Sequence, residues 1–221
     1  MSLFDVIGPV MIGPSSSHTA GAVRLGLMAR SILGRKAKNV EIQLHGSFAK
    51  TGKGHGTHLA LLAGLMGWMP DDERIPKAKE YANKCGLKYE FKEVDLGELV
   101  HPNTVRFEFK GIKGQEREIL GSSIGGGQVE ITEIDSFPIV LTGKFPGVLV
   151  NQYDRPGVVA LVSGILAKYN INIAMMRVFR THKGGNAITM IECDQAVEPK
   201  IIEEIRALNN IEDAIFINSV V

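Results

Sequence analysis

Three consecutive serines, followed by a histidine and a threonine, lie near the start of the sequence in the stretch GPSSSHTAG. The Gly-Pro pair favours an extended approach, and a serine directly before a helix satisfies backbone amides that the helix leaves unpaired. Because one serine suffices for a cap, we expect Ser15, Ser16 and Ser17 to bind an anion as well. The stretch therefore predicts a helix cap, an anion site, or a nucleophile with its base.

His18 is the candidate acid or base in this stretch. It falls in the first turn of the expected helix, where the positive end of the helix dipole disfavours the imidazolium. A neutral imidazole can accept a proton, although an ordinary cap with a solvent-facing histidine fits the same pattern. A serine–histidine nucleophilic pair is the least favoured interpretation, since no third orienting carboxylate lies nearby in the sequence.

A second glycine-rich stretch, GSFAKTGKGHGTH at residues 46–58, is predicted to be a loop that follows a strand. Gly54 and Gly56 let the backbone approach a ligand closely and present its amides to an anion. Lys53 adds a positive charge and His55 adds a second candidate base. The alternative is a flexible turn that leads into the next helix.

Two further functions, nucleotide binding and metal binding, are disfavoured for this second stretch. Its glycine spacing exceeds that of a phosphate-binding P-loop by one residue, and Gly54 stands where that motif needs a hydroxyl. His55 and His58 could share one helix face and a metal, but no third ligand lies nearby in the sequence.

A third stretch, GSSIGGGQVEI, combines hydroxyls with three consecutive glycines. Ser122 and Gly126 either belong to a bulged turn or form a further wall of the same site. His101, in HPNT, is expected to be a turn residue outside the site.

The elements that would position these residues are mixed helices and strands, so we predict an α+β domain over residues 1–143. This N-terminal domain is expected to have a mixed α/β, sandwich-like fold. A helix should follow the serines and end at Gly34, because a glycine and then cations come next. The expected helices are 59–69 and 75–85, and the expected strands are 40–45, 88–94, 104–111, 115–123, 125–134 and 137–143.

A different pattern occupies residues 148–221. Strand, helix, strand, strand, helix and strand follow one another, which is the ferredoxin-like βαββαβ arrangement. The turn DRPG precedes its first helix and KGGN forms its hairpin.

Composition restricts the possible partners and the cellular location of the protein. The chain has 221 residues, 44% of them hydrophobic, and a net charge of +1, so no global field attracts nucleic acid or an anionic membrane. No apolar run reaches the roughly 20 residues that span a bilayer, and the N-terminus lacks a signal-peptide pattern. We therefore expect a cytoplasmic protein that binds neither nucleic acid nor membrane.

The motifs GPSSSHT, GSFAKTGKGHGT, HPNT and SIGGG together resemble the beta chain of the iron–sulfur-dependent L-serine dehydratases. The final 74 residues, with DRPG and NIN, resemble an ACT domain, a small amino-acid-sensing module. The resemblance implies conversion of L-serine to pyruvate and ammonia with a 4Fe-4S cluster.

The resemblance also implies roles for individual residues. His55 would be the proton-abstracting base and His18 a second histidine, while the serines, Thr19, Lys53, Gly54, Gly56, Ser122 and Gly126 would bind substrate. Asp154, Arg155, Gly157 and Asn172 would form a regulatory ligand site of the ACT domain, through which the chain would also self-associate.

Cys85 and Cys193 are the only cysteines, too few and too far apart in the sequence for a cluster. No metal is therefore expected in this chain, and the resemblance places the cluster on a partner alpha chain. The alternative to a dehydratase subunit is a non-catalytic, amino-acid-sensing regulatory protein.

Overall fold

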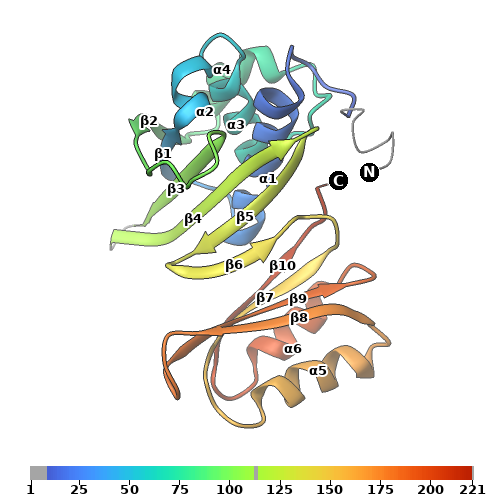
Figure 1. The fold of residues 1–221 in the computed structure, drawn as a ribbon. Helices are drawn as coiled ribbons and strands as arrows, with labels where there is room; N and C mark the ends of the chain where they lie inside the picture. Colours follow the sequence, from blue (N-terminus) through green and yellow to red (C-terminus); the bar gives the residue numbers. More distant parts are fainter. Residues whose placement is uncertain (1–8, 112–113, 221) are drawn as a thin grey trace. The chain divides into compact units, whose positions relative to one another are not determined.

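The computed structural model describes residues 9–111 and 114–220, which divide into two compact units (Figure 1). The first unit runs to Ser136 and includes Val140–Thr142, and the second comprises Phe137–Ile139 and the chain from Gly143. No helix in the described ranges is long and apolar enough to cross a membrane.

The larger sheet has six strands in the order β2-β1-β3-β4-β5-β6, and the first unit contains the first five of them and the end of β6. β1 and β2 pair in parallel, whereas β3 pairs antiparallel with β1 and β4, and β4 pairs antiparallel with β5. The sheet is thus mixed, as the irregular sequence of elements predicts. Its strands are β1 (Asn39–His45), β2 (Lys88–Val94), β3 (Thr104–Gly111), β4 (Gly114–Gly125), β5 (Gln128–Ile134) and β6 (Phe137–Leu141).

The helices of the first unit begin with a π-helical turn, η2 (Ser16–Gly21), which continues directly into α1 (Ala22–Leu33). α1 packs on α3 and against β4 and β5. Gly34 ends α1 in the left-handed conformation, which confirms the predicted stop. The remaining helices are α2 (Gly46–Thr51), α3 (Thr57–Met66), the short 3-10 helix η3 (Ile75–Lys77) and α4 (Ala78–Lys84).

α1 and α3 cross in backbone contact at two glycines. A Cβ atom on Gly26 would lie 2.5 Å from the carbonyl oxygen of Leu61 and 2.9 Å from the Cα of Gly64. A Cβ atom on Gly64 would collide with the carbonyl oxygen of Val23. The two helices can approach this closely only because both positions lack a side chain.

The first half of the second glycine-rich stretch is helical, and the expected loop there is wrong. Its helix, α2, depends on a distant cap, since the backbone amides of Ser47 and Phe48 donate to the carbonyl oxygen of Pro102 at 2.7 and 3.3 Å. Gly46 makes this possible with a φ of +57°. α3 also ends earlier than predicted, at Met66, because Gly67 adopts a left-handed conformation with φ +88°.

β1 is more buried than its alternating pattern predicts. Glu41 is only 5% exposed, because the ammonium groups of Lys92 and Lys110 cover its carboxylate at 2.9 and 2.8 Å. Hydrogen bonds from Lys110, Lys92 and then Gln43 lower the pKa of Glu41 to about 2.

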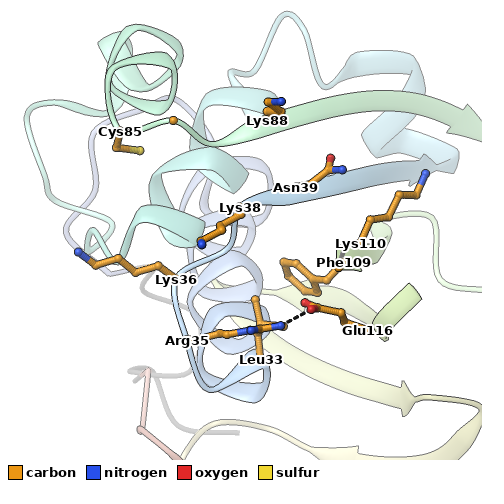
Figure 2. A pocket seen from close by; sticks show the side chains of 12 residues that line it. Leu33, Arg35, Lys36, Lys38, Asn39, Cys85, Lys88, Phe109, Lys110 and Glu116 are labelled. Atoms are coloured by element: carbon orange, nitrogen blue, oxygen red, sulfur yellow. Dashed lines mark ion pairs between the residues drawn. The ribbon is translucent and has the colours of Figure 1, made fainter. Parts of the chain in front are cut away.

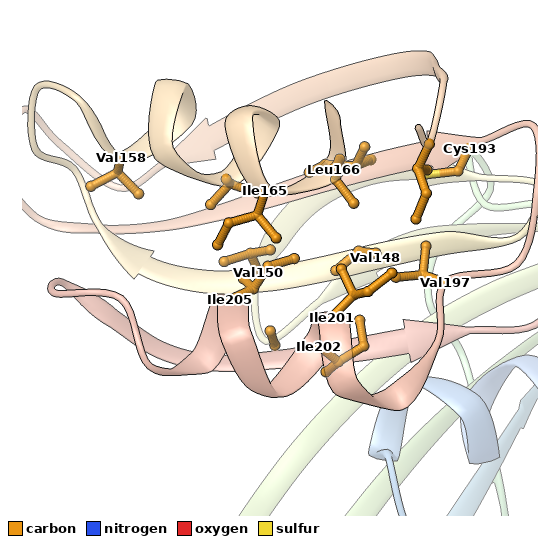
Figure 3. Close-up of a cluster of buried hydrophobic side chains, with 14 residues drawn as sticks. Val148, Val150, Val158, Ile165, Leu166, Cys193, Val197, Ile201, Ile202 and Ile205 are labelled. Atoms are coloured by element: carbon orange, nitrogen blue, oxygen red, sulfur yellow. The ribbon is translucent and has the colours of Figure 1, made fainter. Parts of the chain in front are cut away.

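The second unit has a four-stranded antiparallel sheet in the order β10-β7-β9-β8. Its elements confirm the predicted βαββαβ order. Figure 3 shows its core, in which Val148 and Val150 on the sheet face Ile165, Leu166 and Ile205 on the two helices. The elements are β7 (Gly147–Tyr153), α5 (Val158–Lys168), β8 (Ile173–Arg180), β9 (Asn186–Cys193), α6 (Pro199–Arg206) and β10 (Ile211–Ile217).

Candidate active site around His18 and His55

Ser15 caps the helical segment that carries His18. The Ser15 hydroxyl accepts a hydrogen bond from the backbone amide of His18 at 3.2 Å, and the Ser15 carbonyl accepts one from Thr19 at 2.8 Å. The helix cap predicted for the serine stretch is therefore confirmed. The first turn is wider than an α-helix, and it presents the His18 side chain toward α2.

The imidazole of His18 is held by three hydroxyl groups, those of Ser15, Ser47 and Thr51, which we call the hydroxyl cluster. His18 Nε2 lies 3.1 Å from both Ser47 Oγ and Thr51 Oγ1, and its Nδ1 lies 3.5 Å from Ser15 Oγ. The Ser47 and Thr51 hydroxyls lie 3.3 Å apart on successive turns of α2. Both ring nitrogens of His18 are thus engaged by this chain.

His55 lies beside His18, in the turn between α2 and α3. The two ring centroids are 4.9 Å apart, and Thr19 Oγ1 donates to the carbonyl oxygen of His55 at 3.5 Å. His55 Nδ1 is buried without a hydrogen-bond partner among the described residues. Its Nε2 makes no hydrogen bond there and is not buried. The structure brings together two histidines from separate motifs. His18 is hydrogen-bonded at both ring nitrogens, whereas His55 has an accessible Nε2.

The surroundings keep His18 neutral. Burial lowers the pKa of its imidazole below the ordinary value, and the nearby charge of His55 lowers it further, against a hydrogen bond with Ser47 that raises it. A neutral imidazole can accept a proton from a neighbouring group.

We expect acid to destabilise the first unit through His18 and His58. Burial lowers the pKa of both imidazoles below 6.5, so the unfolded chain binds more protons than the folded chain as the pH falls through this value. Stability should be complete above about pH 6.5 and decrease below it. Urea unfolding, followed by the fluorescence of Trp68, should show a weaker decrease in the double variant His18→Gln/His58→Gln. An unchanged pH dependence in that variant would contradict this.

The other predicted ligand residues of the second stretch lie around the same turn. Lys53 and Gly54 are exposed, and the described residues form no hydrogen bond with the Lys53 side chain. Gly56 has a φ of +73° and is the N-cap residue of α3. Ser16 and Ser17 are half-buried in η2 and make no side-chain hydrogen bond with described residues.

The third stretch contacts η2 through Ser123, the second of its two serines. Ser122 is buried and its hydroxyl lies 2.6 Å from Thr104 Oγ1. Gly126, with φ +59°, belongs to the turn between β4 and β5. Ser123, in contrast, has a buried hydroxyl without a partner, and a Cβ atom on Gly21 of η2 would collide with it.

Sequence reasoning also missed Ser47 and Thr51. Both lie in GSFAKT, and a hydroxyl pair at a spacing of four residues was the available signal. That signal has meaning only on a helix, whereas a loop was expected there.

In the second unit, two of the four predicted regulatory residues, Asp154 and Asn172, form hydrogen bonds within the unit. The carboxylate of Asp154 accepts hydrogen bonds from the amide of Gly184 at 3.0 Å and from Arg180 Nη1 at 2.9 Å, which lower its pKa. Asn172 donates to Asp194 at 2.6 Å. Gly157, with φ +91°, is the N-cap residue of α5, and the neighbouring Arg155 is exposed.

The residues of this chain do not fit an iron–sulfur cluster. Cys85 is exposed on the first unit, and Cys193 is buried in the second, where burial raises its thiol pKa to about 11. Across residues 9–111 and 114–220, no group of three or more His, Cys, Asp or Glu side chains could hold a metal ion. A cluster would need thiolates from another chain.

Comparisons with known proteins agree with this architecture. Residues 2–99 match the family model described as serine dehydratase beta chain, and residues 148–210 match the ACT domain. These matches define a two-part protein in which a histidine-bearing unit precedes an ACT domain.

Individual relatives identify the family. A Bacillus subtilis (strain 168) protein named "Probable L-serine dehydratase, beta chain" is 46% identical over 95% of this chain and 94% of its own length. The "L-serine dehydratase, beta chain" of Peptoniphilus asaccharolyticus is 42% identical over 88% of this chain and 87% of its own. A D-3-phosphoglycerate dehydrogenase of Synechocystis is 24% identical over 87% of this chain but 35% of its own length. This chain belongs to the family of L-serine dehydratase beta chains.

Proposed function

We propose that this chain is the beta subunit of a two-chain L-serine dehydratase, which converts L-serine to pyruvate and ammonia. The position of His55 beside the held imidazole of His18, with the ring centroids 4.9 Å apart, supports this proposal most directly. His55 Nε2 is accessible and makes no hydrogen bond with a described residue, so it can reach a substrate proton.

In this proposal, each histidine has a distinct task. His55 removes the α-proton of serine through Nε2, which no residue of the described chain occupies. His18, fixed by the hydroxyl cluster, is the second histidine and positions the ring of His55. The amides and hydroxyls of η2, with Lys53, bind the substrate carboxylate.

We propose that a partner alpha chain holds the 4Fe-4S cluster. The scattered cysteines of this chain and the absence of a three-ligand group in its described part support that division. Residues 1–143 would then form the substrate domain, and residues 148–221 an ACT domain that pairs two copies of the chain. Light scattering on the chain alone tests this pairing, and a monomer at every concentration would contradict it.

Anaerobic turnover of serine, measured with iron content, tests the proposed division of labour. We expect pyruvate and bound iron only when this chain is combined with a cluster-bearing alpha chain. Turnover and stoichiometric iron in this chain alone would contradict the two-chain assignment. Association with no alpha chain, together with saturable binding of an amino acid, would instead favour a sensing protein.

A further inference from the structure

A cavity lies at the other end of β1 from His18 and His55. It has a volume of about 500 Å³ and opens beside Asn39, the first residue of β1, whereas His45 ends the strand near α2 (Figure 2). This volume is within the range of about 300–1,000 Å³ that is typical of small-molecule sites. Neither the proposed dehydratase function nor the ACT domain uses this cavity.

The cavity concentrates positive charge that the chain as a whole lacks. Five cationic side chains and one carboxylate line it, although the net charge of the chain is only +1. The cations are Arg35, Lys36, Lys38, Lys88 and Lys110, and the carboxylate is Glu116.

Two of these cations already have acidic partners. Arg35 pairs with Glu116, as Figure 2 shows, and Lys110 donates to Glu41 at 2.8 Å. Lys36, Lys38 and Lys88 form no ion pair with any residue in the described ranges. Three positive charges around one cavity are therefore not neutralised by the described chain.

The end of α1 explains only part of this cluster. Cations after a helix C-terminus are favoured by the helix dipole, which accounts for Arg35 and Lys36. Lys88 has a different origin, because it begins β2 and the parallel register pairs it with Asn39. Its amide donates to the carbonyl oxygen of Lys38 at 2.9 Å, so the backbone brings the two lysine residues to the same end of the sheet. The positive charge at the cavity therefore comes from two segments that are far apart in the sequence.

We propose that this cavity binds a compact, multiply charged anion of the phosphate class, either a free phosphate or diphosphate or a small phosphate ester. Lys38 and Lys88 supply charge-assisted hydrogen bonds, and Arg35 offers a bidentate guanidinium once the anion displaces Glu116. The apolar walls of Leu33 and Phe109 accommodate the carbon skeleton of an ester.

Titration calorimetry of the full chain with diphosphate, at low and constant ionic strength, tests the proposal. We expect saturable binding, which the double variant Lys38→Gln/Lys88→Gln weakens by at least about tenfold, since each charged hydrogen bond contributes substantially. Glu116→Gln should tighten binding, because Arg35 is then free. Lys77→Gln, an exposed lysine of η3 outside the cavity, is the matched control and should change nothing.

Further arms of the titration distinguish the sources of the anion. Tighter binding of glycerol phosphate than of inorganic phosphate would assign the site to an ester, and the reverse would assign it to the free anion. The proposal would be overturned if wild type and the double variant bound diphosphate with equal affinity, or if chloride gave the same calorimetric signal. Preference for a single-stranded oligonucleotide over diphosphate would also overturn it. Because the measurement is binding to this chain alone, its outcome does not depend on the dehydratase assignment.

Discussion

A His55→Gln variant, combined with a cluster-bearing alpha chain, is expected to turn over serine about 10²- to 10⁴-fold more slowly than the wild-type chain. Glutamine fills a similar volume but cannot accept the α-proton at neutral pH. The loss should appear in kcat, because the amides and hydroxyls of η2, which we propose to bind the carboxylate, remain in place. Anaerobic pyruvate formation over a range of serine concentrations measures it.

His58→Gln is the matched control for this experiment. His58 lies three residues further on, in α3, and its ring packs edge-to-face on Phe91 at 4.4 Å. The His58→Gln variant should keep kcat within a few-fold of wild type, since the His58 side chain faces β2 and not His18. Full activity of His55→Gln with inactivity of His18→Gln would reverse the two histidine roles. Full activity of both variants would favour the sensing protein instead.

Local sequence signals were sufficient for the second unit. Its strands and helices alternate with clear turn residues, and neighbouring strands are joined by one helix or one hairpin. The boundaries of β2 are likewise those predicted, because Gly86 before it and Asp95 after it limit a short run in which aromatic and charged residues alternate. Where each element is stabilised by its own pattern, the sequence predicts it well.

Long-range contacts decided what the sequence could not predict. α2 forms because Pro102 caps it from a distant loop, and only then do Ser47 and Thr51 face His18. The basic cavity likewise depends on the parallel pairing of β1 with β2, which sets Lys88 beside Lys38. Neither arrangement has a local signature, since the partners lie far apart in the chain and no periodic pattern connects them.

A Gly64→Ala variant is expected to destabilise the first unit by about 1–3 kcal/mol. The added Cβ would meet the Val23 carbonyl oxygen and the Cα of Gly26, both of which are helix backbone and cannot rotate aside. α1 and α3 must then move apart along their crossing. Urea unfolding followed by Trp68 fluorescence measures the loss, because Trp68 is the only tryptophan and is largely buried in the first unit.

Gly54→Ala is the matched control for the Gly64→Ala variant. A Cβ on Gly54 would make only an ordinary contact, 3.6 Å from the carbonyl oxygen of Thr51, so Gly54→Ala should leave stability unchanged or slightly raised. Equal stability of the two variants would disprove the close crossing.

Gly26→Ala should lower the free energy of unfolding about as much as Gly64→Ala does. The double variant should lose less than the sum of the two single losses, because helices already separated by one methyl accommodate the second. His18 precedes α1 and His55 precedes α3, so separation of these helices should also weaken serine turnover in the reconstituted enzyme.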